Sequence, residues 1–313
     1  MLRHVLRRLL LAIPTLLAVF TVIFILVRVA PGDPAVAALG DFASAEAVEA
    51  RREVLGLNEP LWRQYLTFLG DLARGDLGSS LISQRPVAEQ ILFVLPYTLE
   101  LTVAAIAIGL VLGIPTGVIT AVHRNRPLDY VGRVASLFGL SFPAFYLGIL
   151  FIFFFAVKLD LFPAVGAPEF SQPGANLHAL VLPALTLGLI ETAYIARMAR
   201  SVMLTVLGDD YVRTAHAKGL RNLVVLVQHA LRAALIPIVS LVGIFAISLI
   251  GSSVLVEEVF ARPGLGKLMV GATKQKDYTM IQSIMVVYAL IIVVINLITD
   301  IVYTFIDPRV RYD

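Results

Sequence analysis

Residues 208–237 read GDDYVRTAHAKGLRNLVVLVQHALRAALIP, a polar and basic stretch between two apolar segments that decides the fold. Asp210 is suited to cap a helix, because its carboxylate can accept hydrogen bonds from the amides of the first turn. Gly219 suits the position just after a helix, where left-handed backbone ends it. Lys218 would lie in the last turn, where the helix dipole favours a cation. The stretch therefore predicts a short polar helix from Tyr211 to Lys218.

The composition places this helix between membrane segments. Hydrophobic residues make up 58% of the 313 residues, charged residues make up 15%, and the mean hydropathy is +0.87. This is too apolar for a soluble domain. The pI of about 9.2 comes from short basic clusters beside apolar runs, which indicates membrane topology rather than nucleic-acid binding. The chain has no cysteine, which excludes disulfides, thiolate metal ligands and thiol nucleophiles.

Six apolar segments are long enough to cross a bilayer, which takes about 20 helical residues. They are Leu9–Val27, Leu101–Val122, Val134–Val157, Ala179–Ala196, Ala233–Val256 and Tyr278–Thr299. The sequence therefore predicts an all-α polytopic membrane protein with six transmembrane helices. Residues 1–30 form an N-terminal signal-anchor helix, because their apolar run exceeds that of a cleaved signal peptide. Residues 97–313 hold the other five helices and a polar loop at 204–232.

Residues 31–96 are expected to lie outside the cytoplasm and to contain amphipathic helices. Leu61, Tyr65, Phe68 and Leu72 recur at helical spacing. Such a helix lies on the membrane surface or on the other spans, or it forms part of an outer surface that receives a partner protein.

The basic residues predict the orientation. With both termini in the cytoplasm, the basic 204–232 loop lies inside, as the positive-inside rule requires. The segment 257–277 disagrees, because it carries four basic residues on the opposite side.

Five stretches, in order, resemble the B-type permease subunit of dipeptide/oligopeptide ABC importers. They are RRLLLAIPTLL…APGDPA (7–35), GDLGSS…LPYTLEL (75–101), YVRTAHAKGL…HALRAALIP (211–237), EEVFARPGLGKL…KDYTMIQ (257–282) and NLITDIVYTFIDPRVRYD (296–313). The resemblance implies the permease fold of a type I ABC importer, with residues 97–313 as the permease core.

In this family, the polar loop carries a Glu-Ala-Ala pattern on a coupling helix that contacts an ATPase. Arg213, Thr214 and Ala215 stand at the Glu-Ala-Ala positions. Position 213 is the third residue of the expected helix, where a Glu would complete a capping box. An Arg cannot accept that bond, so Asp210 would cap alone. The resemblance assigns ATPase coupling to Asp210, Tyr211, Arg213, Thr214, Ala215, Lys218, Gly219 and Leu220.

The implied complex contains a second homologous permease, two cytosolic ATPase subunits and an extracytoplasmic substrate-binding protein, in a bacterial or archaeal cytoplasmic membrane. ATP and Mg²⁺ would bind the ATPase partners, and no cofactor is expected in this chain. A P-loop needs G-x-x-x-x-G-K-[ST], whereas Gly266-Lys267 is followed by Leu268. The chain is therefore expected to be a non-catalytic peptide permease. The alternatives are import of a nickel chelate, glutathione or an oligosaccharide, or an ion-coupled carrier.

Three residues within the predicted spans are candidates for the translocation path. Glu191 is an ionisable residue in an apolar segment, which is expensive and often functional. It either receives a cationic group of the substrate or is satisfied at a subunit contact or near the headgroups. Ser248 and Ser252 are small residues at i, i+4, suited to helix packing or to lining a path.

The segment 257–277 is expected to form a turn-rich surface or re-entrant hairpin, with permissive backbone at Gly264 and Gly266. The residues predicted to act in binding-protein docking or as an outer gate are Arg262, Pro263, Gly264, Gly266, Asp277 and Tyr278.

Overall fold

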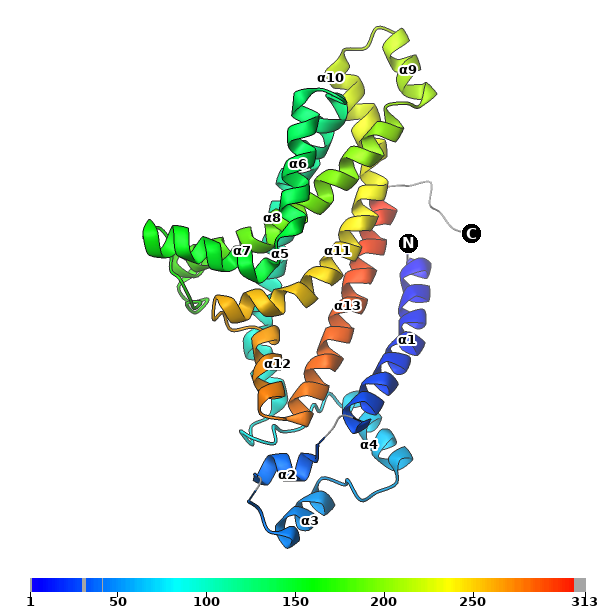
Figure 1. The fold of residues 1–313 in the computed structure, drawn as a ribbon. Helices are drawn as coiled ribbons and strands as arrows, with labels where there is room; N and C mark the ends of the chain where they lie inside the picture. The colour runs from blue at the N-terminus through cyan, green and yellow to red at the C-terminus, as the bar shows by residue number, and fades with distance from the viewer. Residues whose placement is uncertain (1, 30–31, 41, 307–313) are drawn as a thin grey trace. The chain divides into compact units, whose positions relative to one another are not determined.

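The computed structural model describes residues 2–29, 32–40 and 42–306, which are helical and contain no strand beyond one isolated bridge between Ser79 and Pro86 (Figure 1). The helices are α1 (Leu2–Val29), α2 (Pro34–Leu39), α3 (Ala45–Val54), α4 (Leu61–Ala73), α5 (Val87–Val122), α6 (Pro127–Ser141), α7 (Ala144–Phe151), η1 (Ile152–Lys158), α8 (Pro173–Val206), α9 (Asp210–Ala217), α10 (Asn222–Val224), η2 (Val225–Leu231), α11 (Arg232–Val259), α12 (Leu265–Lys274) and α13 (Tyr278–Ile306). Residues 307–313, in the last quoted stretch, lie outside the described residues.

Two compact units make up the chain. Unit 1 contains residues 1–96 and 263–294, and unit 2 contains residues 97–262 and 295–313. The N-terminal segment thus groups with α12 and most of α13, while α6 to α11 lie in unit 2.

Within the residues that the structure describes, five helical segments are long and apolar enough to span a membrane, and a bent pair makes a sixth when it is counted as one span. The all-α fold with six predicted spans is thereby confirmed, but the expected continuous helix at 134–157 is wrong. α6 ends at Ser141, α7 begins at Ala144, and the two are bent by 98°. Phe142 between them is extended, with φ −91° and ψ 130°. It precedes Pro143, whose ring disfavours helical backbone at the preceding residue.

The amphipathic helix α4 packs on α1 within unit 1. Phe68 and Leu72 contact the apolar cluster around Ile23. The Tyr65 hydroxyl lies 2.6 Å from the Thr21 hydroxyl, and the Tyr65 ring meets that of Phe24 edge to face. The predicted apolar stripe therefore lies against the first span.

Unit 2 is built on close packing between α5, α8 and α11. A Cβ on Gly113 of α5 would come within 2.8 Å of Ile195 Cβ, and a Cβ on Gly117 would come within 2.5 Å of Ala199 Cβ. Glycine lets α5 approach α8 this closely. α11 packs against α8, and a core cluster around Leu182, Leu249 and Phe260 fills the space between them.

Candidate functional site

The predicted short helix exists as α9, which follows α8 in unit 2 (Figure 1). Asp209, and not Asp210, is the residue that caps it, with φ −71° and ψ 147° and no side-chain capping bond. The reason is the end of α8, where the Asp209 amide donates to the Val206 carbonyl and fixes the turn one residue early. Arg213 is therefore the fourth helical residue, and the capping-box comparison does not apply. Its guanidinium instead lies 3.6 Å from the Asp210 carboxylate, and both side chains are exposed.

Gly219 closes α9 as predicted. Its φ is +76°, in the left-handed region that favours glycine. Its amide donates to the His216 carbonyl at 2.9 Å, and the Leu220 amide reaches the Ala215 carbonyl at 3.4 Å. These two bonds are those of a Schellman motif, which satisfies the last carbonyls of the helix.

One face of α9 attaches it to the spans. Val212 and Ala215 are buried against Val225, with Val206 and Leu207 packed on them. Val206 and Leu207 lie at the end of α8, and Val225 is the first residue of η2, so α9 contacts two spans at once.

The opposite face of α9 is exposed and mostly polar. The candidate residues Asp210, Tyr211, Arg213, Thr214, Lys218, Gly219 and Leu220 are all exposed. Partial burial and the charge of Asp209 raise the pKa of Tyr211. Of the residues predicted to contact a partner, only Ala215 belongs to the buried face, so the helix can present its other side to a groove in another protein.

The candidates within the spans occupy different environments. Glu191 is buried in α8 and packs closely against Gly109 of α5. Any side chain larger than hydrogen at position 109 would collide with it, because an added Cβ would lie 2.8 Å from the Glu191 Cβ. Ser248 and Ser252 are exposed on α11, and the Ser252 hydroxyl donates to the Ser248 carbonyl. The structure therefore does not bring Glu191 and the two serines onto a common face.

Arg262 is fully buried, which removes it from a docking surface in this structure. Its guanidinium bonds to the Glu100 carboxylate, lies 3.4 Å from the Asn176 side-chain oxygen and stacks over Tyr97 at 5.4 Å. Asn176 in turn donates to Glu100 at 2.7 Å. Burial lowers the pKa of Arg262, against the opposing charge of Glu100. The residue thus ties the segment after α11 to α5 and α8, and the sequence offered no signal for partners so distant along the chain.

The rest of the 257–277 segment is a helix rather than the expected hairpin. α12 begins after Pro263 and Gly264, and Gly264 has φ −167°, an extended conformation open to any residue. Gly266 is buried inside α12. The chain is helical here because one face of α12 is apolar, and Leu265 and Ala272 pack into the core of unit 1.

Asp277 immediately precedes α13, and Tyr278 is its first residue. Asp277 accepts from the Met280 amide at 3.1 Å, which caps the helix. It also accepts from the Ser80 hydroxyl at 2.5 Å and the Leu81 amide at 3.2 Å. Asp277 and Tyr278 are both buried, so these contacts hold unit 1 together.

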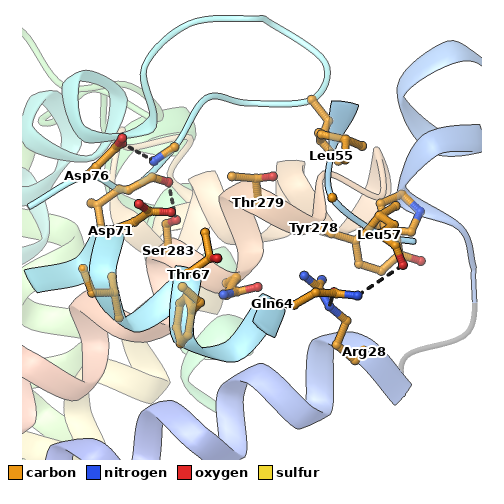
Figure 2. Close-up of a pocket in the computed structure, with 18 of the residues that line it drawn as sticks. Arg28, Leu55, Leu57, Gln64, Thr67, Asp71, Asp76, Tyr278, Thr279 and Ser283 are labelled. Carbon is orange, nitrogen blue, oxygen red and sulfur yellow. Dashed lines mark hydrogen bonds between the residues drawn. The ribbon is translucent and has the colours of Figure 1, made fainter. Parts of the chain in front are cut away.

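Unit 1 also holds a pocket of about 450 Å³ that the sequence did not reveal (Figure 2). Its wall comes from α1, α4, residues 55–57 and the start of α13. Arg28 donates to Gln64 at 2.8 Å, and Figure 2 shows Asp71 and Asp76 on the other side of the hollow. The polar side of α4 was the one feature of the sequence that could have indicated this pocket. Such mixed charge suits a zwitterionic ligand or the charged side chains of a partner.

Comparison with known proteins identifies membrane components of transport systems over nearly the whole chain. The profile of the family described as "Binding-protein-dependent transport system inner membrane component" matches residues 113–312, and that of its N-terminal part matches residues 1–102. The chain is 39% identical to the dipeptide transport system permease protein DppB of Alkalihalophilus pseudofirmus. It is 42% identical to the glutathione transport system permease protein GsiC of Pectobacterium atrosepticum. Both comparisons cover 100% of each chain.

Among solved structures, the fold is similar to that of the MetNI methionine ABC transporter in inward-facing conformations. The TM-score is 0.57 at 20% identity, and the match covers 69% of this chain and 95% of the other.

Proposed function

Since this chain belongs to the family of binding-protein-dependent transport system inner membrane components, we propose that it is the permease subunit of an ATP-driven importer of dipeptides or short oligopeptides. It is a multi-pass inner membrane protein of the ABC importer class. Support for a peptide substrate comes from the two full-length relatives, whose names specify a dipeptide and glutathione, both built from amino acids.

The observation that carries the proposal is the attachment of α9. This helix packs by Val212 and Ala215 on the ends of two spans and leaves its other face open. A cytosolic ATPase would take that open face into a groove. Movement of α9 would then shift α8 and the segment that begins at η2, and the permease would exchange inward- and outward-open states as a rigid-body change. The permease thus couples nucleotide binding at one site to substrate access at another.

The proposed complex contains a second homologous permease, two cytosolic ATPase subunits and an extracytoplasmic binding protein. Both termini and α9 lie in the cytoplasm, which puts the basic loops on the side that the positive-inside rule favours. ATP and Mg²⁺ bind to the ATPase partners, and the sequence carries no P-loop motif with which this chain would hydrolyse ATP. The chain therefore contributes the spans through which the substrate passes and the coupling helix α9, and it carries out no bond-making chemistry.

The chain contains no cysteine, so single cysteines test this proposal cleanly. Thr214→Cys lies on the exposed face of α9, and Arg74→Cys lies on an exposed site of unit 1, where the side chain is 81% exposed. In whole cells, a membrane-impermeant maleimide should label position 74 and spare position 214. In the assembled complex, a short crosslinker should join position 214 to an ATPase subunit. Labelling of position 214 from outside, or no crosslink in an active complex, would overturn the assignment.

An ion-coupled carrier would instead depend on Glu191. This carboxylate is buried against α5, away from the exposed face of α11. We expect Glu191→Gln to retain ATP-driven uptake with an unchanged pH profile. Uptake that becomes independent of pH, or that persists without the ATPase, would favour the carrier.

A further inference from the structure

A second pocket, of about 290 Å³, lies in unit 2 where α5, α6 and α8 meet. Its charged lining residues are all arginines: Arg133 of α6, and Arg197 and Arg200 of α8. The function proposed above makes no use of this pocket. Arg133 and Arg197 are exposed and Arg200 is partly buried, so water and salt screen part of the repulsion between the three guanidinium groups, and a negative ligand between them would relieve the rest.

One carboxylate compensates part of this charge. Asp129 is fully buried, and Arg200 reaches its two oxygens at 2.6 and 2.8 Å. Arg133 lies 3.6 Å from the same carboxylate and stacks at 4.5 Å over Tyr130. Asp129 is the only carboxylate within ion-pair distance of the three arginines, among the residues that the structure describes.

Arg197 is the third arginine that lines this pocket. Its guanidinium lies 5.9 Å from the centre of the Tyr194 ring, a neutral partner. Asp129 can balance one guanidinium, so the pocket keeps an excess of two positive charges. A dianion, or a monoanion with further polar groups, fits this excess.

The donors available to such an anion are the three guanidinium groups and the hydroxyl of Ser201, which also lines the pocket. The hydroxyls of Thr116, Thr120 and Ser136 also line the pocket, but each donates to a carbonyl of its own helix, at 2.6 to 2.9 Å. Arginine presents paired N–H groups that match two oxygens of a phosphate. The chemistry of the pocket is therefore that of a phosphate site.

The surroundings indicate which phosphate. Beside the pocket, α6 exposes Val134, Leu137 and Phe138, which are 54%, 58% and 62% exposed. An exposed apolar face next to clustered arginines suits a ligand with a charged head and hydrocarbon chains. We propose that the pocket between α5, α6 and α8 binds the phosphate of an anionic phospholipid, whose acyl chains lie along the outer face of α6.

The test uses the complete transporter, purified in detergent and titrated with dioleoylphosphatidylglycerol while bound lipid is measured by native mass spectrometry. Arg133→Gln/Arg197→Gln removes two of the three positive charges, including the longer contact of Arg133 with Asp129, and keeps the closer ion pair between Asp129 and Arg200. Affinity for this lipid should fall about tenfold or more. The matched control is Arg124→Gln/Arg126→Gln, which removes two exposed charges from the preceding loop and should change affinity by less than about twofold. Dioleoylphosphatidylcholine should bind both variants and the parent protein equally weakly.

Three outcomes would overturn the proposal: unchanged affinity in the pocket variant, equal loss in pocket and control variants, or displacement of the lipid by inorganic phosphate alone. The last result would assign the site to a soluble anion. If the double variant fails to assemble, Ser136→Leu decides the matter, because it fills the pocket without changing its charge. That variant should also lose phosphatidylglycerol, and retention of the lipid would refute the site.

Discussion

The ion pair between Asp129 and Arg200 provides the sharpest test of how unit 2 is held together. Asp129 lies in the first turn of α6 and Arg200 in α8, and these two helices pack against each other. The carboxylate also accepts from the Asn125 amide at 3.0 Å, in the turn that leads into α6. Asp129→Asn keeps the shape of the side chain and removes its charge, so it leaves Arg200 without its counter-ion.

The size of the effect follows from burial. Breaking a buried ion pair on one side costs about 3–5 kcal/mol. Arg200 keeps 20% of its side chain exposed, so water offsets part of this loss and the lower end applies. We therefore expect about 3 kcal/mol. At about 2.1 cal/mol/K of unfolding entropy per residue, a chain of 313 residues shifts by about 1.5 °C per kcal/mol, so the midpoint of thermal unfolding should fall by roughly 4–5 °C.

The assay is thermal unfolding of the detergent-purified protein, followed by intrinsic fluorescence, in a double-mutant cycle. Arg200→Gln should destabilise the protein by a similar amount, and the double variant should lose less than the sum of the two. The exposed pair of Asp210 and Arg213 is the control, because its side chains are 95% and 79% exposed and its removal should change little. A midpoint within about 1 °C of the parent for Asp129→Asn, or strict additivity in the cycle, would refute the argument.

Three further predictions concern other contacts. Arg262→Gln removes a fully buried guanidinium from Glu100, so the midpoint of thermal unfolding should fall by several degrees, on the order of 3 kcal/mol. Gly219→Ala places a side chain at φ +76°, which costs about 1 kcal/mol and loosens the end of α9. Peptide-stimulated ATPase activity should therefore fall while insertion is unchanged. Burial raises the pKa of Asp33, but hydrogen bonds from Arg52 and the Ala35 amide outweigh this and lower it overall. Its contribution to stability is then present above the ordinary pKa of about 3.9 and is lost as pH falls through the lower folded value, measured by unfolding between pH 6 and 3.

Matched variants separate these effects from general damage. Arg74→Gln removes an exposed arginine and should leave the midpoint of thermal unfolding unchanged. Equal shifts for Arg74→Gln and Arg262→Gln would contradict a stabilising contact between Arg262 and Glu100. Gly174→Ala lies at ordinary backbone with open space around it, so it should retain coupling, and full coupling in Gly219→Ala would count against α9 as the lever. Arg52→Gln should reduce the acid-dependent part of the stability that Asp33 provides, because only the backbone hydrogen bonds to Asp33 remain, and an unaltered pH profile would exclude the pair as its source.

The parts of the fold that were predictable depend on local chemistry. A run of about 20 uncharged residues implies a span whatever surrounds it, and a glycine after a polar helix implies its end. The position of Gly219 was therefore correct, whereas the start of α9 was displaced by one residue, because adjacent aspartates can both serve as caps. Asp209 was chosen by the way α8 ends, which no short pattern contains.

The features that the sequence did not predict depend in part on contacts between residues far apart in the chain. The bend after Ser141 occurs inside an apolar run that composition alone assigns to one helix, and Pro143 is compatible with a kinked span as well as with a break. Glu100 was left out because the spans were defined as uncharged, although α5 begins at Val87 and includes it. Arg262 was assigned to binding-protein docking or an outer gate because it lies in the segment 257–277, which was expected to form a surface or re-entrant hairpin. A charged residue is expected outside until its partners are known, and here they lie far away in the sequence.

The way in which α9 is held in place is consistent with the lever role proposed for it above. A helix of eight residues is marginal on its own, because nucleation costs more than so few bonds return. α9 therefore persists through its Schellman end and through Val212 and Ala215, which bind it to α8 and η2. η2 is a π-helical segment, and such irregular turns are concentrated at functional sites. Because α9 is held in place by the spans, a force applied to its exposed face passes to them before the helix itself unfolds.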